Sequence, residues 1–293
     1  MKVLVSGGTG LVGRYIVNGL LDAGHTVVVG ARKPQPHGFF AQPLEFRSLQ
    51  LDPGLDQIGA FEGIEAFIHA AFDHLPGRYR GGEGQDPKRF QRLNLDGSAK
   101  LFETAKSAGV QRVVFLSSRA VYDGLLPGTR LTEDLSLCPN SLYGEIKLAC
   151  ERALSALSGQ DFITASLRAT GIYGELHPNK WDDLIADALA GRPIAPRAGT
   201  EVHGADVAQA VRLMLELPPS SINGQNFNLS DVTVDTRTIL EKLGLSAQMV
   251  AFTALSANVM DTEKIRRIGW QPGEMRRFEE TMAILARQYD SDH

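Results

Sequence analysis

The N-terminal half of the chain alternates two patterns of hydrophobic and polar residues. Short runs rich in valine, isoleucine and leucine predict strands, and longer segments with apolar residues every three or four positions predict amphipathic helices. Strands are expected at residues 2–6, 26–29, 44–49, 65–69, 112–116 and 162–167, and helices at 11–23, 88–108 and 142–157. Strands that alternate with helices in this way predict an α/β fold with a Rossmann-type, doubly wound parallel sheet.

The pattern becomes less regular after residue 168. Prolines and glycines become more frequent, and helices are expected near residues 181–190, 205–217, 236–243, 262–268 and 276–287. We therefore predict a sheet-based domain over residues 1–168, with 204–230 returning to it. Residues 169–203 and 231–293 are expected to form a smaller, mostly helical region that binds substrate.

The composition limits the classes of partner. With 43% hydrophobic and 22% charged residues, the chain resembles an ordinary globular protein. Its formal net charge of −4 gives no basis for binding nucleic acid or an anionic membrane surface. No apolar stretch approaches the ~20 residues of a membrane span and no signal peptide is evident, so we expect a cytoplasmic location. Cys138 and Cys150 form neither a disulfide framework nor a metal-binding spacing, and no metal site is expected.

A glycine-rich loop follows the first strand. Residues 6–13 read Ser-Gly-Gly-Thr-Gly-Leu-Val-Gly and lead directly into the first helix. In such loops Gly7 allows a tight turn, Gly10 lets the backbone approach a pyrophosphate, and Gly13 lets the helix pack on the strand. The helix N-terminus offers free N–H groups to the phosphates, so Thr9, Leu11 and Val12 are also expected at the coenzyme. A strand, this loop and a helix in succession favour a dinucleotide site over a glycine turn without a ligand.

A second group of residues predicts acid–base chemistry. Tyr143 and Lys147 are four residues apart and therefore lie on one face of the expected helix. A nearby ammonium lowers the pKa of a tyrosine from about 10 and makes it a usable general acid or base. Ser118 follows the fifth strand, at the edge where open α/β sheets bind ligands. A Tyr-x-x-x-Lys pair alone is common on helix surfaces, so the hypothesis depends on this combination.

These strings resemble the extended branch of the short-chain dehydrogenase/reductase superfamily, which contains NAD(P)-dependent epimerases, dehydratases and reductases. The resemblance covers nearly the whole chain, through residues 7–13, 67–71, 93–97, 117–122, 143–147, 167–174, 202–208 and 268–272. It implies that Ser118 holds the substrate oxygen, that Tyr143 moves the hydroxyl proton, and that Lys147 binds the nicotinamide ribose. It further places Ala70 and Ala71 along the coenzyme, and has Asn94 bracing the site.

Two further positions bear on coenzyme and substrate contacts. The resemblance puts Asp52 beside the adenine, although an N-cap of a helix before Pro53 is an alternative reading of that residue. It also puts Thr170 in the segment beside the nicotinamide, where it can contact substrate.

The end of the second strand favours NADP over NAD. An acidic residue there would hold the ribose 2′-hydroxyl of NAD, but the expected position is Ala31. Arg32 and Lys33 follow, and an arginine can bind a 2′-phosphate through two hydrogen bonds. NADP is therefore predicted and NAD remains possible, since both cations can also be solvated loop residues.

The substrate is expected to be a small, sugar-like molecule. Members of the resembled superfamily that act on nucleotide sugars usually carry a longer stretch between the Gly-x-Pro-Ile turn and the His-Val segment. Here only eight residues separate the turn at 191–194 from His203, so the resemblance implies a substrate smaller than a full nucleotide-diphosphate sugar. Arg192 and Arg197 are candidates for holding an anionic group. Arg78 and Arg80, in a glycine-rich loop, are candidates for a substrate-covering lid, with a solvated loop as the alternative.

The leading hypothesis is an oxidoreductase or epimerase that transfers hydride between the nicotinamide and a hydroxyl or keto carbon. The sequence does not separate net redox from epimerisation. A non-catalytic NADP-binding sensor is the alternative, although such relatives typically lose the tyrosine or the lysine, and this chain keeps both. The resemblance also implies a homodimer formed through the helices at 88–108 and 142–157.

Overall fold

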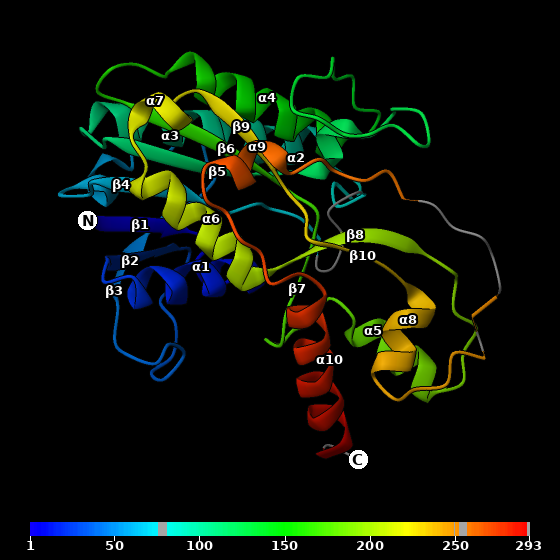
Figure 1. The fold of residues 1–293 in the computed structure, drawn as a ribbon. Coiled ribbons are helices and arrows are strands. Elements are labelled where there is room, and N and C mark those ends of the chain that lie inside the picture. The colour runs from blue at the N-terminus through cyan, green and yellow to red at the C-terminus, as the bar shows by residue number, and fades with distance from the viewer. Residues whose placement is uncertain (76–80, 249, 252–256, 292–293) are drawn as a thin grey trace.

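A computed structural model describes residues 1–75, 81–248, 250–251 and 257–291. Its central element is a parallel sheet of seven strands in the order β3-β2-β1-β4-β5-β6-β9, visible in the left half of Figure 1. The strands are β1 (Lys2–Ser6), β2 (Thr26–Ala31), β3 (Glu45–Ser48), β4 (Ala66–His69), β5 (Arg112–Ser118), β6 (Ile163–Ala169) and β9 (Gln225–Leu229). The predicted Rossmann-type sheet is confirmed, and β9 adds a strand that was not predicted.

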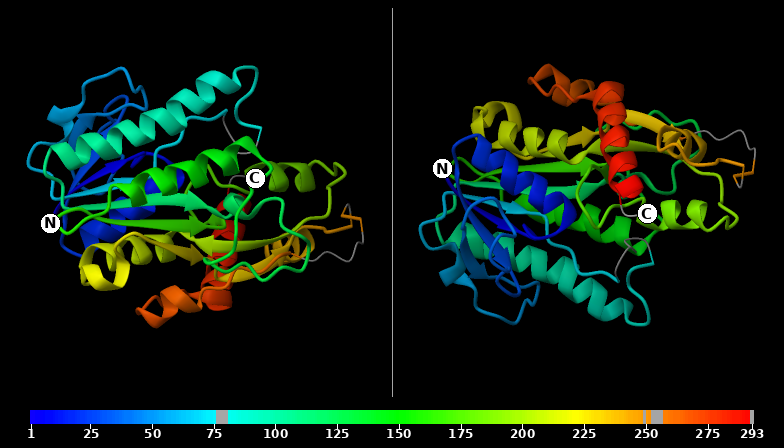
Figure 2. Two further views of the ribbon diagram at one scale, coloured as in Figure 1. Left: turned by 90° about the horizontal axis from the view of Figure 1, so that it is seen from above. Right: turned by 90° about the horizontal axis from the view of Figure 1, so that it is seen from below.

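Helices cover both faces of this sheet (Figure 2). α1 (Leu11–Asp22) and α6 (Gly204–Glu216) pack on one face, and α3 (Gly97–Ser107) and α4 (Leu142–Ala156) pack on the other. Successive strand residues alternate between the two layers, so Val3 and Val5 contact the first pair of helices and Leu4 contacts the second. Burial on both faces explains why these strands are nearly continuous apolar runs.

The long helix expected at 88–108 is interrupted. It begins as α2 (Pro87–Gln91), passes through a π-helical turn, η2 (Arg92–Asp96), and continues as α3. Asp86 caps its start by accepting the N–H of Arg89 at 2.9 Å. π-Helical turns inside longer helices are frequent at functional sites, and this one contains Asn94.

The C-terminal region contains a small sheet of order β10-β8-β7 as well as helices. Its strands are β7 (Gly171–Tyr173), β8 (Ala198–His203) and β10 (Val232–Asp235), and none of the three was predicted. The helices beside this sheet are α5 (Asp182–Leu189), α8 (Thr236–Lys242) and the long α10 (Glu274–Ser291). α9 (Glu263–Arg267) instead packs on β9 of the large sheet (Figure 1). α7 (Pro219–Ile222) and the 3-10 turns η1 (Ile58–Phe61) and η3 (Arg119–Tyr122) are the remaining elements. Tyr173, Trp181 and Phe278 form part of a separate hydrophobic core in this region.

Candidate active site

The glycine-rich loop connects β1 to α1 under tight steric limits. Gly7 has a φ of 68°, in the left-handed region, and a Cβ there would lie 2.8 Å from the Cα of Ala71. A Cβ on Gly13 would overlap the Gly7 carbonyl oxygen and lie 2.7 Å from the Cα of Gly8. The loop therefore packs against the segment of Ala70 and Ala71 that follows β4, and α1 packs against the loop.

The same loop fits a pyrophosphate. Gly10 is exposed at the start of α1, and no side chain among the described residues caps this helix. The N–H groups of the first turn, including those of Leu11 and Val12, therefore lack helical partners. A Cβ on Gly10 would meet only the Gly7 carbonyl, at 3.4 Å, within the described structure. This exposed end of α1 can bind the phosphates of a dinucleotide through backbone N–H groups and the helix dipole, with Thr9 beside it.

A chain of hydrogen bonds joins the strand below this loop to the π-helical turn. His69 contacts the hydroxyl oxygens of Ser6 and Ser98, through Nδ1 at 2.7 Å and Nε2 at 2.9 Å. Because Ser98 donates its proton to the Asn94 carbonyl, it accepts from His69 Nε2–H, and Ser6 donates to Nδ1. Complete burial, and secondarily the charge of Lys147, lowers the pKa of His69 to about 3. His69 is a neutral structural residue.

Asn94 fastens the segment after β4 to this turn. Its side-chain oxygen accepts the N–H of Asp73 at 2.7 Å, and its Nδ2 donates to the carbonyls of Asp73 (2.8 Å) and Phe90 (3.0 Å). These three bonds fully engage a buried amide. They fix the main chain that passes the C-terminal ends of β1 and β4, which agrees with the bracing role that the sequence predicts for Asn94.

Lys147 is buried where β5 ends. Its Nζ donates to the Leu116 carbonyl at 2.7 Å and lies 4.6 Å from the ring centroids of both Phe72 and Phe115. Burial lowers the pKa of Lys147 to about 8. Tyr143, one helical turn earlier, is also buried and packs edge-to-face on Phe72, with 5.0 Å between the ring centroids. The lysine ammonium lies 5.9 Å from the Tyr143 ring centroid, on the same face of α4.

Ser118 lies at the last position of β5 and is half-buried. Its hydroxyl oxygen accepts the N–H of Ala120 at 3.1 Å and so caps η3. That turn packs on the start of α4, because a Cβ on Gly144 would overlap the Ala120 carbonyl. Ser141 caps α4 by accepting the Gly144 N–H at 3.2 Å. The sequence-predicted Ser118, Tyr143 and Lys147 therefore come from two elements that pack directly on each other.

The end of β2 carries two exposed cations. Arg32 and Lys33 both point away from the protein core, and the Arg32 side chain is 78% exposed. The Arg32 Nη1 lies 3.9 Å from a carboxylate oxygen of Asp73, which also accepts from Arg89 at 2.9 Å. The guanidinium is thus free to move toward a ligand beside β2, since an exposed ion pair at this distance is weak.

Asp52 holds a turn. Its Oδ1 accepts the N–H of Gly54 at 3.0 Å, and this bond, followed by the charge of Arg92, lowers the pKa of Asp52. Residues 51–55 form a bend and turn, so the alternative reading of Asp52 as a helix N-cap before Pro53 is wrong.

The candidate substrate residues differ in their surroundings. Thr170 is buried, and its Oγ1 has no hydrogen-bond partner among the described residues. Arg192 is exposed after α5 and forms an ion pair with Asp187 at 2.6 Å. Arg197 is exposed just before β8. Arg78 and Arg80 lie outside the described residues.

One fully buried ion pair and one partly buried ion pair were not singled out from the sequence. Arg168 binds Glu151 through two nitrogens, with Nη2 at 2.8 Å and Nε at 3.0 Å from the carboxylate oxygens. Lys180 forms an ion pair with Glu201. The partners are far apart in sequence, and a charged residue in an otherwise apolar strand, such as Arg168 in β6, was the available signal.

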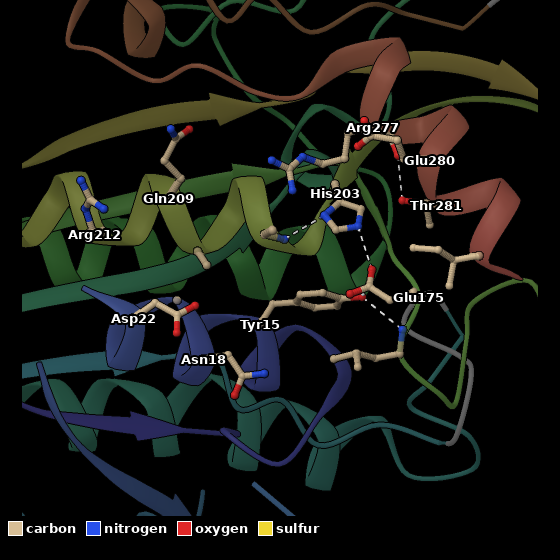
Figure 3. A pocket seen from close by; sticks show the side chains of 15 residues that line it. Tyr15, Asn18, Asp22, Glu175, His203, Gln209, Arg212, Arg277, Glu280 and Thr281 are labelled. Atoms are coloured by element: carbon tan, nitrogen blue, oxygen red, sulfur yellow. Dashed lines mark hydrogen bonds and ion pairs between the residues drawn. The ribbon is translucent and has the colours of Figure 1, made fainter. Parts of the chain in front are cut away.

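A cavity of about 510 Å³ lies between α1, α6 and α10 (Figure 3). On its wall, Tyr15 donates to Glu175 at 3.0 Å and His203 Nε2 lies 3.1 Å from the same carboxylate oxygen. The His203 contact is the main reason why the pKa of Glu175 falls to about 2. His203 Nδ1 accepts the Ala205 N–H and caps α6. This cavity lies on the helix layer opposite α4, and so on the other face of the sheet from Tyr143.

The described residues contain neither a cluster of metal ligands nor a helix suited to cross a membrane. Within residues 1–75, 81–248, 250–251 and 257–291, no group of three or more His, Cys, Asp or Glu side chains could hold a metal ion. Over the same part of the chain, no helix has the length and apolar character needed to cross a membrane.

The strand order, the glycine loop and the Tyr143–Lys147 pair define a dinucleotide-binding protein of the short-chain dehydrogenase/reductase type. Comparison with protein families agrees. The chain belongs to the NAD dependent epimerase/dehydratase family, whose model matches residues 3–230.

Individual relatives include dehydrogenases and epimerases. A 3-beta-hydroxysteroid dehydrogenase of Mycolicibacterium neoaurum is 32% identical over 195 residues, which are 65% of this chain and 52% of the relative. The chain thus spans about half the length of that protein. A D-erythronate dehydrogenase of Cupriavidus necator is 27% identical over 292 residues, 92% of this chain and 86% of the relative. The UDP-glucose 4-epimerase of Thermus thermophilus, solved with NAD, superposes with a TM-score of 0.80 at 25% identity, with 100% of each chain covered.

Proposed function

We propose that this protein is an NADP-linked oxidoreductase that acts on a hydroxyl or keto carbon of a small, sugar-related metabolite. The observation that carries the proposal is the placement of Tyr143 and the buried Lys147 against the end of β5, at the same edge of the sheet as a loop that fits a pyrophosphate. Residues 1–168 and 204–230 would hold the coenzyme, and residues 169–203 and 231–293 would hold the substrate.

Tyr143, Lys147 and Ser118 have separate tasks in this proposal. The coenzyme supplies a hydride acceptor or donor when it is bound. Tyr143 takes the hydroxyl proton during oxidation and returns it during reduction. Lys147 holds the ribose and favours the phenolate by its positive charge, and Ser118 donates a hydrogen bond to the substrate oxygen. The aromatic rings of Phe72 and Phe115 exclude water from the ammonium, which strengthens its effect on Tyr143.

The coenzyme preference rests on the end of β2. Ala31 provides no carboxylate for a ribose 2′-hydroxyl, and the exposed Arg32 can bind a 2′-phosphate. The Thermus thermophilus epimerase was solved with NAD, so a test of this preference compares the binding of NADP with that of NAD.

The length over which the relatives align with this chain supports the proposed substrate class. The D-erythronate dehydrogenase aligns over nearly the whole length of both chains, whereas the sterol dehydrogenase aligns over about half of its own. Together with the short link between residues 194 and 203, this favours net oxidation or reduction of a small molecule. Epimerisation is the second candidate function, because the fold superposes over its whole length on a UDP-glucose 4-epimerase.

We further propose a homodimer through α3 and α4, which light scattering in solution tests.

The experiment is to record nicotinamide absorbance with NADP⁺ or NADPH and a panel of sugar acids, simple sugars and nucleotide sugars. Sustained turnover in the wild type and none in Tyr143→Phe, with NADPH binding retained, is the expected result. A sugar whose configuration changes without a change in absorbance would show an epimerase. Full activity of Tyr143→Phe would overturn the proposed mechanism, and coenzyme binding without turnover of any substrate would support a sensor.

A further inference from the structure

The segment that follows β6 borders the proposed reaction site. Ser118, the last residue of β5, pairs with Ala169, the last residue of β6. The chain then continues through Thr170 to Gly171, the first residue of β7. A group that lies over Gly171 is therefore close, along the sheet edge, to the position that Ser118 would offer to a substrate hydroxyl.

An ion pair covers Gly171. A Cβ at this position would overlap both the Lys180 ammonium and the Glu201 carboxylate, and Gly171 is paired with Glu201 in the register of β7 and β8. The two side chains are 19% and 5% exposed. Gly171 thus provides the space that this pair occupies, and any larger residue would displace it.

The Lys180 backbone is fixed on both sides. Asn179, which is buried, accepts the N–H of Trp181 at 3.0 Å, donates to the Gly174 carbonyl, and bonds through its own N–H to Asp182 at 2.7 Å. Trp181 is buried and stacks on Tyr173, with 5.6 Å between the ring centroids. The loop therefore holds Lys180 in one place, as a binding residue requires.

The charges around the pair sum to one positive charge. A Cβ on Gly199 would lie 3.6 Å from Glu201 Oε1 and 3.8 Å from Arg197 Nη2, so both groups lie above that glycine. Two cations and one carboxylate match a monoanion, and a dianionic phosphate would leave excess negative charge beside Glu201. Burial lowers the pKa of Lys180, and Glu201 opposes that change.

Lys180 and the neighbouring residue Thr170 both have unused hydrogen-bonding capacity. An ammonium has three N–H donors, and within the described residues the one hydrogen bond from Lys180 goes to Glu201. Thr170, the residue before Gly171, is buried with an unpartnered Oγ1. A buried ion pair contributes little net stability, because desolvation offsets the attraction between its charges. An unpaired buried hydroxyl such as that of Thr170 is also costly, and the remaining ammonium donors of Lys180 are available to a ligand.

We propose that Lys180, positioned by Glu201, binds the carboxylate of the substrate, and that the substrate is a small polyhydroxy acid. Glu201 accepts a hydroxyl of the same molecule, and Arg197 adds long-range attraction for its negative charge. This inference rests on the proposed oxidoreductase function, and it adds the substrate class and the residue that recognises it.

The test measures kcat and KM of the full chain with NADP⁺ and matched substrates. Erythronate and threonate are the acids, erythritol and threitol are their neutral counterparts, and erythrose 4-phosphate is the phosphate probe. We expect turnover of an acid with a kcat/KM at least about 10-fold above that of the alditols, since a charged hydrogen bond contributes ~1.5–3 kcal/mol. A preference for the alditols or the phosphate would overturn the proposal.

Three variants and one control assign the effect to Lys180. Lys180→Met should raise KM for the acid by about 10- to 100-fold with little change in kcat, and Lys180→Arg should recover part of the affinity. Lys180→Met/Glu201→Gln leaves no unpaired buried charge, so it should fold even if the single variant does not. Lys242→Met removes an exposed lysine that pairs with Glu279, and it should leave KM unchanged. An unchanged acid KM in the folded double variant would overturn the assignment.

Calorimetry separates this inference from the proposed function. Erythronate is titrated into wild-type and double-variant protein saturated with NADPH, and binding is expected to weaken by the same factor as KM. If the wild type binds the acid through Lys180 but Tyr143→Phe is as active as the wild type, only the proposed mechanism fails. If neutral sugars are turned over and erythronate does not bind, only the Lys180 inference fails.

Discussion

Lys147 donates a hydrogen bond from α4 to the main-chain carbonyl of Leu116, across 2.7 Å. Ser118 ends the same strand two residues later, so this bond ties the helix that carries Tyr143 to the strand that carries Ser118. The ammonium is enclosed by the rings of Phe72 and Phe115, and its charge is therefore poorly screened.

We predict that Lys147→Met lowers kcat by at least about 100-fold, because it removes the cation that favours the Tyr143 phenolate. Lys106→Met is the matched control. Lys106 also donates to a main-chain carbonyl, that of Leu157 at 2.7 Å, but on the exposed surface. Steady-state kinetics and a thermal melt of both variants check the prediction, and activity of Lys147→Met near that of the control would contradict it.

Arg32→Ala should weaken NADPH binding by about 10-fold or more and leave NADH binding nearly unchanged, because only NADPH carries the 2′-phosphate that the guanidinium can bind. Arg267→Ala is the control, since Arg267 is similarly exposed and pairs with Glu263 on α9. Fluorescence titration with both coenzymes measures the change. Equal losses of affinity for NADH and NADPH would show that Arg32 does not bind the 2′-phosphate.

The parts of the fold that follow from local spacing could be predicted from the sequence. The glycine loop and the four-residue spacing of Tyr143 and Lys147 depend on neighbours in the chain, and both lie where the pattern places them. The strand β9 could not be predicted in this way. It contains the buried polar residue Asn228, whose Nδ2 is satisfied by the distant carbonyls of Leu131 and Asp261.

The residues of the proposed substrate site were also harder to predict, because their contacts join segments that are distant in the sequence. Lys180 and Glu201 meet only because β7 and β8 pair in a register that places Gly171 opposite Glu201. The three strands of the small sheet are short, and β8 lacks a clear alternation of polar and apolar residues. Arg192 stood out in the sequence as a cation, but its charge is compensated by Asp187 in the fold.

Removing one partner of the buried Glu151–Arg168 pair should destabilise the protein strongly. Arg168→Met leaves the Glu151 carboxylate buried, with Ser117 as its remaining hydrogen-bond donor among the described residues, at a cost of about 3–5 kcal/mol. Glu151→Met/Arg168→Met removes both charges and should recover most of that loss. Urea denaturation gives the free energies of unfolding. A double variant no more stable than the single one would show that the pair itself, rather than the unpaired charge, determines the stability.

His69 should make the stability of the protein depend on pH in a defined window. Its pKa is about 3 in the folded chain and near 6.5 when it is exposed by unfolding. Between these values the unfolded state binds more protons, so the contribution of His69 is complete above pH 6.5 and is lost progressively as the pH falls toward 3. Near pH 5 the loss should approach about 1.4 kcal/mol per pH unit from this residue.

Burial lowers the pKa of His69, and its hydrogen bonds leave no acceptor for an added proton. Nδ1 accepts from Ser6 while Nε2–H donates to Ser98, so a proton on Nδ1 would face a hydroxyl that is already donating. His69→Gln cannot titrate and should show a shallower fall in unfolding free energy between pH 6.5 and 5. His37→Gln, which changes an exposed histidine, should keep the wild-type slope. Equal slopes for wild type and His69→Gln would mean that His69 takes up its proton without unfolding, which would contradict the neutral, fully bonded imidazole of the structure.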